Sequence, residues 1–242
     1  MHGPSPISSF NWLTAWFRLA AMNCIVTAGP TSEPLDEVRR LTNFSTGRLG
    51  SEFANFLTAR GHTVTLLIGA QATWRGERHA RQVETFTTTE GLRERLRALS
   101  SPAVEAVFHA AAVSDFSFGK IWQRSPKSEL TEIKTGKISS RLEGLLVELV
   151  PAPKVIAHLR DWFPRACLVG WKFAVDGDRA GAVAQAASQI SENRTNACVA
   201  NGRAYGHGFG LVTGPGRYKH IDELEGLFKA LEESALKSPP AS

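Results

Sequence analysis

The sequence predicts an α/β fold: a Rossmann-like three-layer sandwich with a mostly parallel central sheet, a small β-hairpin arm and a lid loop. Short, nearly continuous apolar runs alternate with amphipathic stretches, which is typical of parallel strands covered by helices on both faces. Asn23 to Ala28 is the first such run, and Thr63 to Ile68 is the second. Between them lies a loop rich in small residues that leads into a helical pattern.

The first helix is predicted from the spacing of its apolar side chains. Leu49, Phe53, Phe56 and Leu57 fall close to the i, i+4, i+7, i+8 spacing of one helix face. Gly61 follows the last of them, where a left-handed residue commonly ends a helix. With its flanking strands, this helix makes the first half of a Rossmann-like unit.

The same alternation continues to the end of the chain. The further expected strands are 83–87, 106–112, 144–150, 166–173 and 197–200. The further expected helices are 90–99, 154–163, 179–192 and 221–236.

Two segments depart from this alternation. Residues 117–144 are polar and irregular and carry four lysines, among them Lys137. A connection of this length is usually a lid or is disordered, and we expect a lid. Residues 206–216 are glycine-rich and predict the β-hairpin arm, although their glycines would also suit a phosphate-binding loop.

The chain is expected to hold one domain, 23–236, between an N-terminal extension, 1–22, and a disordered tail, 237–242. Met22 stands directly before the first strand, so it is an alternative start for the protein. The apolar part of the extension is too short to span a bilayer and lacks the basic start of a signal peptide.

The composition of the chain limits the classes of binding partner that can be expected. The formal charge of +5 is mildly basic, but Lys and Arg are spread along the chain, so a nucleic-acid stripe is not indicated and no membrane span is expected. Cys24, Cys167 and Cys198 each fall in an apolar run, which predicts buried thiols and fits a reducing cytoplasm. The spacing of His and Cys offers no structural metal site.

The loop before the first helix is the candidate anion site. Ser45 and Thr46 stand where a helix N-cap is expected, so unpaired N–H groups and the positive end of the helix dipole would face the loop. Gly47 and Gly50 would let a ligand approach the backbone, and Asn43 sits at the lip. An ordinary capped helix would show the same residues.

A dinucleotide site is disfavoured by spacing. Its fingerprint places G-x-G-x-x-G directly between strand and helix, with an acid at the end of the second strand. Here the gap from Ala28 to Ser45 is too long, and Gly69 follows the second strand. A Rossmann-like oxidoreductase or flavin-binding protein is therefore kept only as an alternative.

Separated motifs carry a more specific resemblance. They are T-A-G-P-T-S-E-P-L-D-E-V-R from Thr27, T-N-F-S-T-G-R-L-G from Thr42, A-A-V-S-D-F from Ala111 and G-K-I-S-S from Gly136, with the weaker P-K-V-I and L-V-G-W-K after them. In this order they resemble the phosphopantothenoylcysteine synthetases, in particular the stand-alone bacterial form, within the DNA/pantothenate metabolism flavoprotein C-terminal domain family.

The resemblance implies a ligase of coenzyme A biosynthesis. Such an enzyme joins 4′-phosphopantothenate to L-cysteine through an acyl-nucleotide, cleaving CTP, or less readily ATP, to the monophosphate and pyrophosphate. It also implies Mg²⁺, a homodimer and a cytoplasmic location.

The resemblance further implies two catalytic residues, Asn43 and Lys137. Asn43 would hold the acyl-nucleotide, and Lys137 would contact the nucleotide; a turn residue and a solvated loop lysine are the plainer alternatives. Trp171 would stack on the base, with core packing as its alternative. The implied nucleotide-binding residues are Gly29, Ser45, Thr46, Gly47, Gly50, His109, Ala110, Ala111, Asp115, Lys137, Pro153, Lys154, Val155, Ile156, Trp171 and Lys172.

Some positions depart from the family pattern. Some relatives carry two lysines in the helix before the A-N-D strand. The nearest positions in this sequence hold Gln189, Glu192 and Asn193, and Gly202 stands where that strand has its Asp. Lys172 could supply the missing charge. A non-catalytic relative that binds a phosphorylated ligand is therefore the second alternative.

Overall fold

The computed structural model describes residues 21–142 and 144–237. The predicted extension and tail lie almost wholly outside these residues, so they stay predictions, as does the single domain expected over 23–236. Among the described residues, no helix has the length and apolar character needed to cross a bilayer.

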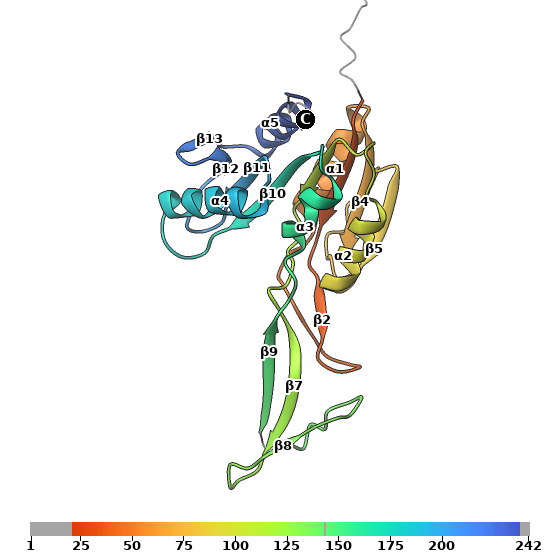
Figure 1. The fold of residues 1–242 in the computed structure, drawn as a ribbon, viewed down its shortest axis with the longest axis vertical. Coiled ribbons are helices and arrows are strands. Elements are labelled where there is room, and N and C mark those ends of the chain that lie inside the picture. Colours follow the sequence, from red (N-terminus) through yellow and green to blue (C-terminus); the bar gives the residue numbers. More distant parts are fainter. Residues whose placement is uncertain (1–20, 143, 238–242) are drawn as a thin grey trace, which may run out of the picture.

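An eight-stranded sheet forms the centre of the molecule (Figure 1), with spatial order β13-β12-β11-β10-β6-β1-β4-β5. From β11 to β5 all neighbours pair in parallel, whereas β12 and β13 are added antiparallel. The bounds are β1 (Asn23–Ala28), β4 (Thr63–Gly69), β5 (Gln82–Phe86), β6 (Ala106–His109), β10 (Cys167–Phe173), β11 (Ala197–Asn201), β12 (Phe209–Gly214) and β13 (Arg217–Ile221).

Helices cover both faces of this sheet, which confirms the predicted three-layer α/β fold. One face carries α1 (Arg48–Ala59) and α5 (Leu224–Lys237). The other carries α2 (Thr89–Ala98), α3 (Val155–Trp162) and α4 (Arg179–Asn193). The inner strands β1, β4, β6, β10 and β11 are mostly buried on both sides, which is why their sequences are largely apolar, whereas the edge strands β5 and β13 are more exposed and more polar.

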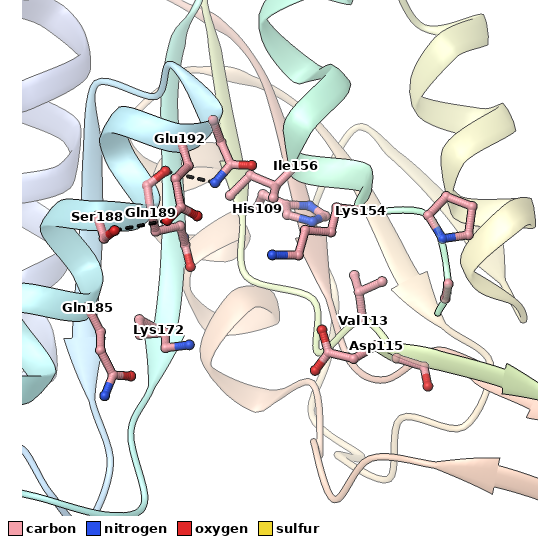
Figure 2. Close-up of a pocket in the computed structure, with 14 residues that line it drawn as sticks. His109, Val113, Asp115, Lys154, Ile156, Lys172, Gln185, Ser188, Gln189 and Glu192 are labelled. Atoms are coloured by element: carbon pink, nitrogen blue, oxygen red, sulfur yellow. Dashed lines mark hydrogen bonds between the residues drawn. The ribbon is translucent and has the colours of Figure 1, made fainter. Parts of the chain in front are cut away.

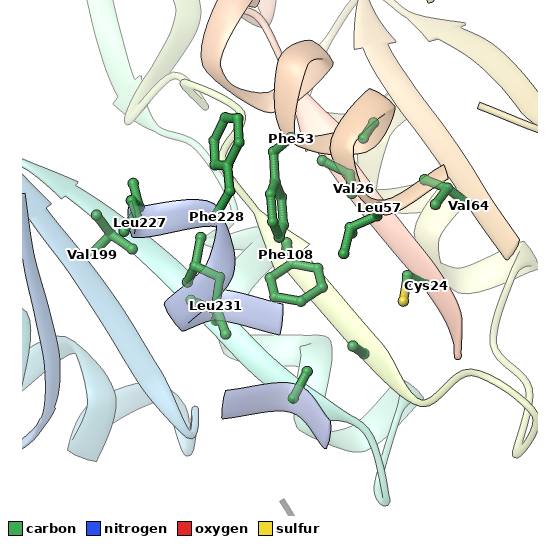
Figure 3. Packing of buried hydrophobic residues seen from close by; sticks show 14 of the residues in the cluster. Cys24, Val26, Phe53, Leu57, Val64, Phe108, Val199, Leu227, Phe228 and Leu231 are labelled. Carbon is green, nitrogen blue, oxygen red and sulfur yellow. The ribbon is translucent and has the colours of Figure 1, made fainter. Parts of the chain in front are cut away.

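Aromatic side chains form the centre of the core between the sheet and the helices α1 and α5 (Figure 3). The ring of Phe53 on α1 meets Phe108 on β6 edge-to-face, with centroids 4.7 Å apart, and Phe228 on α5 at 5.1 Å. Gly61 has a φ of +90°, so α1 ends in the left-handed glycine that the sequence predicts. All three cysteines are buried, as expected.

The predicted lid at 117–144 is wrong for much of its length. Its place is taken by an arm of three antiparallel strands, β7 (Phe116–Arg124), β8 (Leu130–Glu132) and β9 (Leu145–Pro151), which projects from the body (Figure 1). The strand expected at 144–150 exists as β9, but it belongs to this arm rather than to the central sheet. No side chain of β7 or β9 is fully buried; β9 still carries an apolar run, whereas β7 mixes polar and apolar residues and lacks the pattern of a buried strand.

The β-hairpin predicted at 206–216 is present as β12 and β13, but it extends the central sheet instead of forming a separate arm. Leu211 pairs with Val199 of β11, and Val212 is fully buried beneath α4. A second hairpin, β2 (Ser32–Pro34) with β3 (Arg40–Thr42), was not predicted.

The start of α1 differs from the predicted cap. Gly47, with a φ of +78°, is the N-cap residue, and the Thr46 hydroxyl accepts the Arg48 N–H at 3.2 Å. Ser45 and Thr46 are therefore not the cap itself. The glycines face protein: a Cβ on Gly47 would lie 2.9 Å from Ile68, and one on Gly50 would lie 2.6 Å from Ala28. They permit close helix–sheet packing.

Candidate functional site

The switch point of the sheet lies between β1 and β6, since the chain leaves β1 for β4 on one side and later enters β6 on the other. Open α/β sheets bind ligands outside the carboxyl ends of the strands at such a point. A cavity of about 320 Å³ opens there, between the end of β6, β10, the start of α3 and one side of α4.

The cavity is polar and carries charges of both signs (Figure 2). Lys154 at the N-cap of α3 and Lys172 on β10 direct their ammonium groups into the space that Asp115 faces from the loop after β6. Glu192 on α4 lines the same space and accepts a hydrogen bond from Ser188 at 2.9 Å. Two ammonium groups that face one cavity can offset the charge of an anionic ligand such as a phosphate.

Six of the nucleotide-binding residues predicted from the sequence line this cavity. They are His109, Asp115, Pro153, Lys154, Ile156 and Lys172. Val155, between two of them, is buried against the sheet instead, because alternate sides of the α3 start face the cavity and the core.

Asn43 is exposed at the edge of this site. Its side-chain Nδ2–H donates to the Ala112 carbonyl at 3.1 Å, and the same carbonyl accepts the Thr31 N–H at 3.1 Å. Ala112 is one residue before Val113, which lines the cavity. The Asn43 amide is thus tied to the strand end from which the cavity opens.

The strand end itself is ordered by Thr27. The Thr27 carbonyl accepts the Ala110 N–H at 3.2 Å, and its hydroxyl accepts the Ala111 N–H at 3.1 Å. Ala110 and Ala111 therefore shape the rim through their backbone, although neither lines the cavity. The Thr27 hydroxyl also lies 3.0 Å from Nδ1 of His109. Burial lowers the pKa of His109 to about 4, so its ring is neutral at physiological pH.

The predicted phosphate cradle at α1 lies outside this cavity. Gly29 and Gly47 both face Ala72, and the Trp74 N–H donates to the Thr46 carbonyl at 3.0 Å. The loop after β4 thus covers the glycines between β1 and α1. A dinucleotide would need that space for its pyrophosphate, so the arrangement speaks against the oxidoreductase alternative.

Lys137 is exposed on the loop between β8 and β9, away from the cavity lining. Its neighbours are docked on the turn of the β2–β3 hairpin: Glu37 N–H donates to the Gly136 carbonyl at 2.9 Å, and Ile138 N–H donates to Asp36 Oδ2 at 3.2 Å. The structure therefore does not bring Lys137 together with the cavity of its own chain.

Trp171 packs against the core on the α1/α5 face, opposite to the side where Lys172 lines the cavity. Adjacent strand residues point to opposite faces, so only one of the two can reach a ligand there. Core packing is the arrangement observed. Its Nε1 is buried without a hydrogen-bond partner among the described atoms.

Sequence reasoning missed several cavity residues, among them Gln185 and Ser188 on α4, and it named Gln189 and Glu192 only as departures from the family pattern. Gln185, Ser188, Gln189 and Glu192 share one side of that helix, as their i, i+3, i+4, i+7 spacing allows. This polar stripe was the available signal. It also shows that the departures noted at Gln189, Glu192 and Asn193 all face the cavity.

A mostly parallel sheet with a lysine-lined cavity beside its switch point defines a Rossmann-like α/β protein whose cavity is suited to an anionic ligand. The family model described as DNA/pantothenate metabolism flavoprotein C-terminal domain matches residues 19–215. The chain belongs to this family.

Individual proteins and solved structures that are similar to this chain are consistent with this family assignment. The chain is 31% identical over 183 residues to the coenzyme A biosynthesis bifunctional protein CoaBC of Thermococcus kodakarensis, which covers 76% of this chain but only 42% of that protein. A crystal structure of the DNA/pantothenate metabolism flavoprotein from Streptococcus pneumoniae superposes with a TM-score of 0.75 at 27% identity, covering 88% of this chain and 97% of that one. A Cab2 variant in complex with phosphopantothenate-cysteine shares the fold, with a TM-score of 0.62 at 18% identity and coverage of 89% and 87%.

Proposed function

We propose that this protein is a ligase that joins 4′-phosphopantothenate to L-cysteine in coenzyme A biosynthesis, using CTP. A carboxylate oxygen of phosphopantothenate attacks the α-phosphorus, and pyrophosphate leaves. The cysteine amine then attacks the acyl carbon, the bond to the nucleotide oxygen breaks, and the monophosphate and one proton are released. The relatives support this proposal, because one is named for coenzyme A biosynthesis and another was solved with phosphopantothenate-cysteine.

The observation that carries the proposal is the cavity itself. Lys154, Lys172 and Asp115 converge at the carboxyl ends of β6 and β10, next to the strand end that holds Asn43. The two lysines would offset the repulsion between an attacking carboxylate and the α-phosphate. Asp115 is a hydrogen-bond acceptor of the kind that a ribose hydroxyl requires.

Asn43 would act in the second step. When the cysteine amine attacks, the carbonyl oxygen of the acyl-nucleotide gains charge, and a fixed amide N–H stabilises that oxygen. Loss of one such donor typically costs about 3 kcal/mol of transition-state stabilisation. The hydrogen bond from Asn43 to the Ala112 carbonyl uses one of its two amide protons, which leaves the other for substrate.

Mg²⁺ is part of the proposal. Among the described side chains, no group of three or more His, Cys, Asp or Glu is arranged to hold a metal ion. Mg²⁺ often takes one or two protein carboxylates and completes its shell with substrate phosphates and water. Asp115 and Glu192 are the carboxylates of the cavity, so the donor set fits an ion that arrives with the nucleotide and offsets phosphate charge.

A homodimer is proposed because of the arm. An isolated small sheet is marginally stable in water, yet β7 to β9 project from the body and expose large apolar side chains. These are Phe116, Leu130, Leu145 and Leu149, each 41–53% exposed. Packing the arms of two copies together would cover them and would move each Lys137 loop toward the second copy. A cytoplasmic location follows from the proposed reaction.

The decisive experiment is pyrophosphate release from phosphopantothenate with CTP or ATP, each with and without cysteine. We expect release with CTP and product only when cysteine is present. Lys137→Gln should abolish pyrophosphate release, whereas Lys134→Gln, a change to an exposed lysine of the same loop, should not. Asn43→Asp should let the acyl-nucleotide accumulate. Equal turnover in Lys137→Gln and wild type would contradict the role given to Lys137.

The second candidate is a non-catalytic phospho-ligand-binding relative. It is favoured by α4, which presents Gln189 and Glu192 to the cavity where some relatives have lysines. Tight CTP binding without pyrophosphate release would select it.

A further inference from the structure

Thr27 and His109 form a buried polar pair at the switch point of the sheet. They are direct neighbours across the parallel β1–β6 pairing, so their side chains leave the same face. Thr27 is completely buried and His109 is 6% exposed. Most buried polar side chains have a hydrogen-bond partner, so a donor and an acceptor can be sought for each polar atom of this pair.

The hydrogen bonds fix the tautomer of the imidazole. The Thr27 hydroxyl already accepts the Ala111 N–H at 3.1 Å, and its own proton needs an acceptor. Among the described residues, the acceptor within reach is Nδ1 of His109, 3.0 Å from the hydroxyl oxygen. Donation of the Thr27 O–H to Nδ1 satisfies the Thr27 hydroxyl and the Nδ1 atom, and it leaves the neutral ring protonated on Nε2.

The Nε2–H of His109 is the group that these hydrogen bonds leave without a partner. His109 lines the cavity, and Nε2 has no hydrogen-bond partner among the described residues. A merely structural histidine would be expected to spend both nitrogens on protein partners. Here one nitrogen is spent on the fold, and the other remains for a ligand.

We propose that His109 is a binding residue that donates its Nε2–H to an acceptor atom of the nucleotide, and that Thr27 is the positioning residue that fixes this donor. The acceptor is a carbonyl or phosphate oxygen, or an unprotonated ring nitrogen. This inference rests on the proposed function only in naming a nucleotide as the ligand.

The first test is spectroscopic and needs no activity. The full chain is labelled with ¹⁵N-histidine, and the His109 ring signals are assigned by their loss in His109→Leu. We expect the Nε2–H tautomer with a hydrogen-bonded Nδ1 from pH 6 to 8. Thr27→Val should move the Nδ1 resonance because its donor is lost, and Thr27→Ser should restore it. An Nδ1–H tautomer or an imidazolium at pH 7 would overturn the assignment.

The second test measures CTP and ATP binding to the same proteins at equilibrium. Loss of one hydrogen bond to a neutral donor should weaken binding about fivefold to tenfold in His109→Leu. His109→Gln places an amide N–H at a similar distance and should recover most of the affinity. His79→Leu, at a histidine with a 60% exposed side chain, is the matched control and should bind as wild type does.

The results separate the two proposals. If the wild type binds neither nucleotide, the proposed function fails, and the nucleotide fails as the ligand of His109. If the wild type binds CTP and His109→Leu binds it equally well, only the role of His109 is wrong. Unchanged affinity in Thr27→Val with a normal melting temperature would likewise remove Thr27 as the positioning residue.

Discussion

The cavity and the Lys137 loop are two parts of one proposed site that are held in different ways. The cavity is built from the ends of buried strands, and Asn193, Ser114 and His109 on its wall are each no more than 7% exposed. The Lys137 loop instead lies on the surface of an exposed hairpin turn, fixed by hydrogen bonds to its backbone. The body thus supplies a preformed pocket, whereas the loop depends on polar contacts.

This difference indicates how binding and chemistry are divided. Moving the cavity wall would expose the core, which is costly. Undocking the loop exchanges hydrogen bonds with protein for hydrogen bonds with water, which costs little net free energy. Elements that move during catalysis are drawn from such low-stability segments. We therefore expect the nucleotide to meet a rigid pocket and Lys137 to arrive as a mobile group.

The largest expected effect concerns which subunit supplies the Lys137 that acts at each cavity. Heterodimers of an Asn43→Asp copy and a Lys137→Gln copy can be purified through two different tags. If Lys137 crosses to the second copy, one of the two sites is intact, and about half of wild-type turnover is expected by symmetry. Steady-state formation of the phosphopantothenate–cysteine amide measures this, because Asn43→Asp blocks only the second step and still permits a first release of pyrophosphate.

We expect that recovery because Lys137 lies outside the cavity of its own chain. Tagged dimers carrying Lys137→Gln on both copies are the control and should be inactive. Heterodimers without activity would show that both groups come from one chain.

Core and arm can be compared by truncating one apolar side chain in each. Phe53→Ala removes a fully buried ring from the α1/α5 face and should destabilise folding by about 3–5 kcal/mol. Leu149→Ala on the arm, at a residue that is 50% exposed, should cost the monomer well under about 1 kcal/mol. Urea denaturation of each variant measures both. A loss for Leu149→Ala that depends on protein concentration would show the arm buried in the dimer.

Acid should act on the body through His109. Its pKa is about 4 when folded and near 6.5 when unfolded, so between these values the unfolded chain binds the extra proton. The contribution of the neutral ring is complete above pH 6.5 and is lost as the pH falls toward 4, by about 3 kcal/mol at most. His109→Leu should flatten the stability profile over this window relative to wild type. An identical slope in both proteins would be inconsistent with a buried neutral ring.

The sequence predicts the body better than the arm for a physical reason. Strands buried on both faces need continuous apolar residues, so β1, β4 and β10 can be predicted from the apolar runs in the sequence. Among the described residues, no side chain of β7, β8 or β9 is fully buried, so the sequence of 117–144 resembles that of a loop. Gln185 and Ser188 could not be assigned, because only the docking of α4 decides which of its polar residues face the cavity.

The register of strands limits the prediction in the same way. Trp171 and Lys172 are adjacent, and no local signal says which of them faces the cavity. Likewise, Thr27 is an ordinary strand threonine in the sequence, and its bond to His109 exists only because β1 and β6 pair in register. Thr27 therefore emerges from the structure alone.

The smallest expected effect tests the contact that docks the Lys137 loop. The Asp36 side chain is fully buried, and its carboxylate accepts N–H groups from Val38, Arg39 and Ile138. Burial tends to raise the pKa of Asp36, but these donors outweigh it and lower that pKa, so the carboxylate stays charged. Asp36→Asn keeps the shape but places N–H groups against the Ile138 N–H and the Arg39 guanidinium. We expect trypsin to cut after Lys137 about tenfold faster, because the loop undocks more often.

Asp161→Asn removes an exposed carboxylate paired with Arg194 at 2.7 Å and serves as the matched control, with unchanged cleavage. Turnover separates docking from chemistry. If the docked loop is a resting position that Lys137 must leave, trypsin should cut the Asp36→Asn variant faster, yet the variant should keep or raise its rate of pyrophosphate release. If the docked position is the active one, release should fall in step with protection. Equal cleavage of Asp36→Asn and wild type would mean that the hairpin does not hold the loop, and the contrast between a rigid pocket and a docked lysine would lose its structural basis.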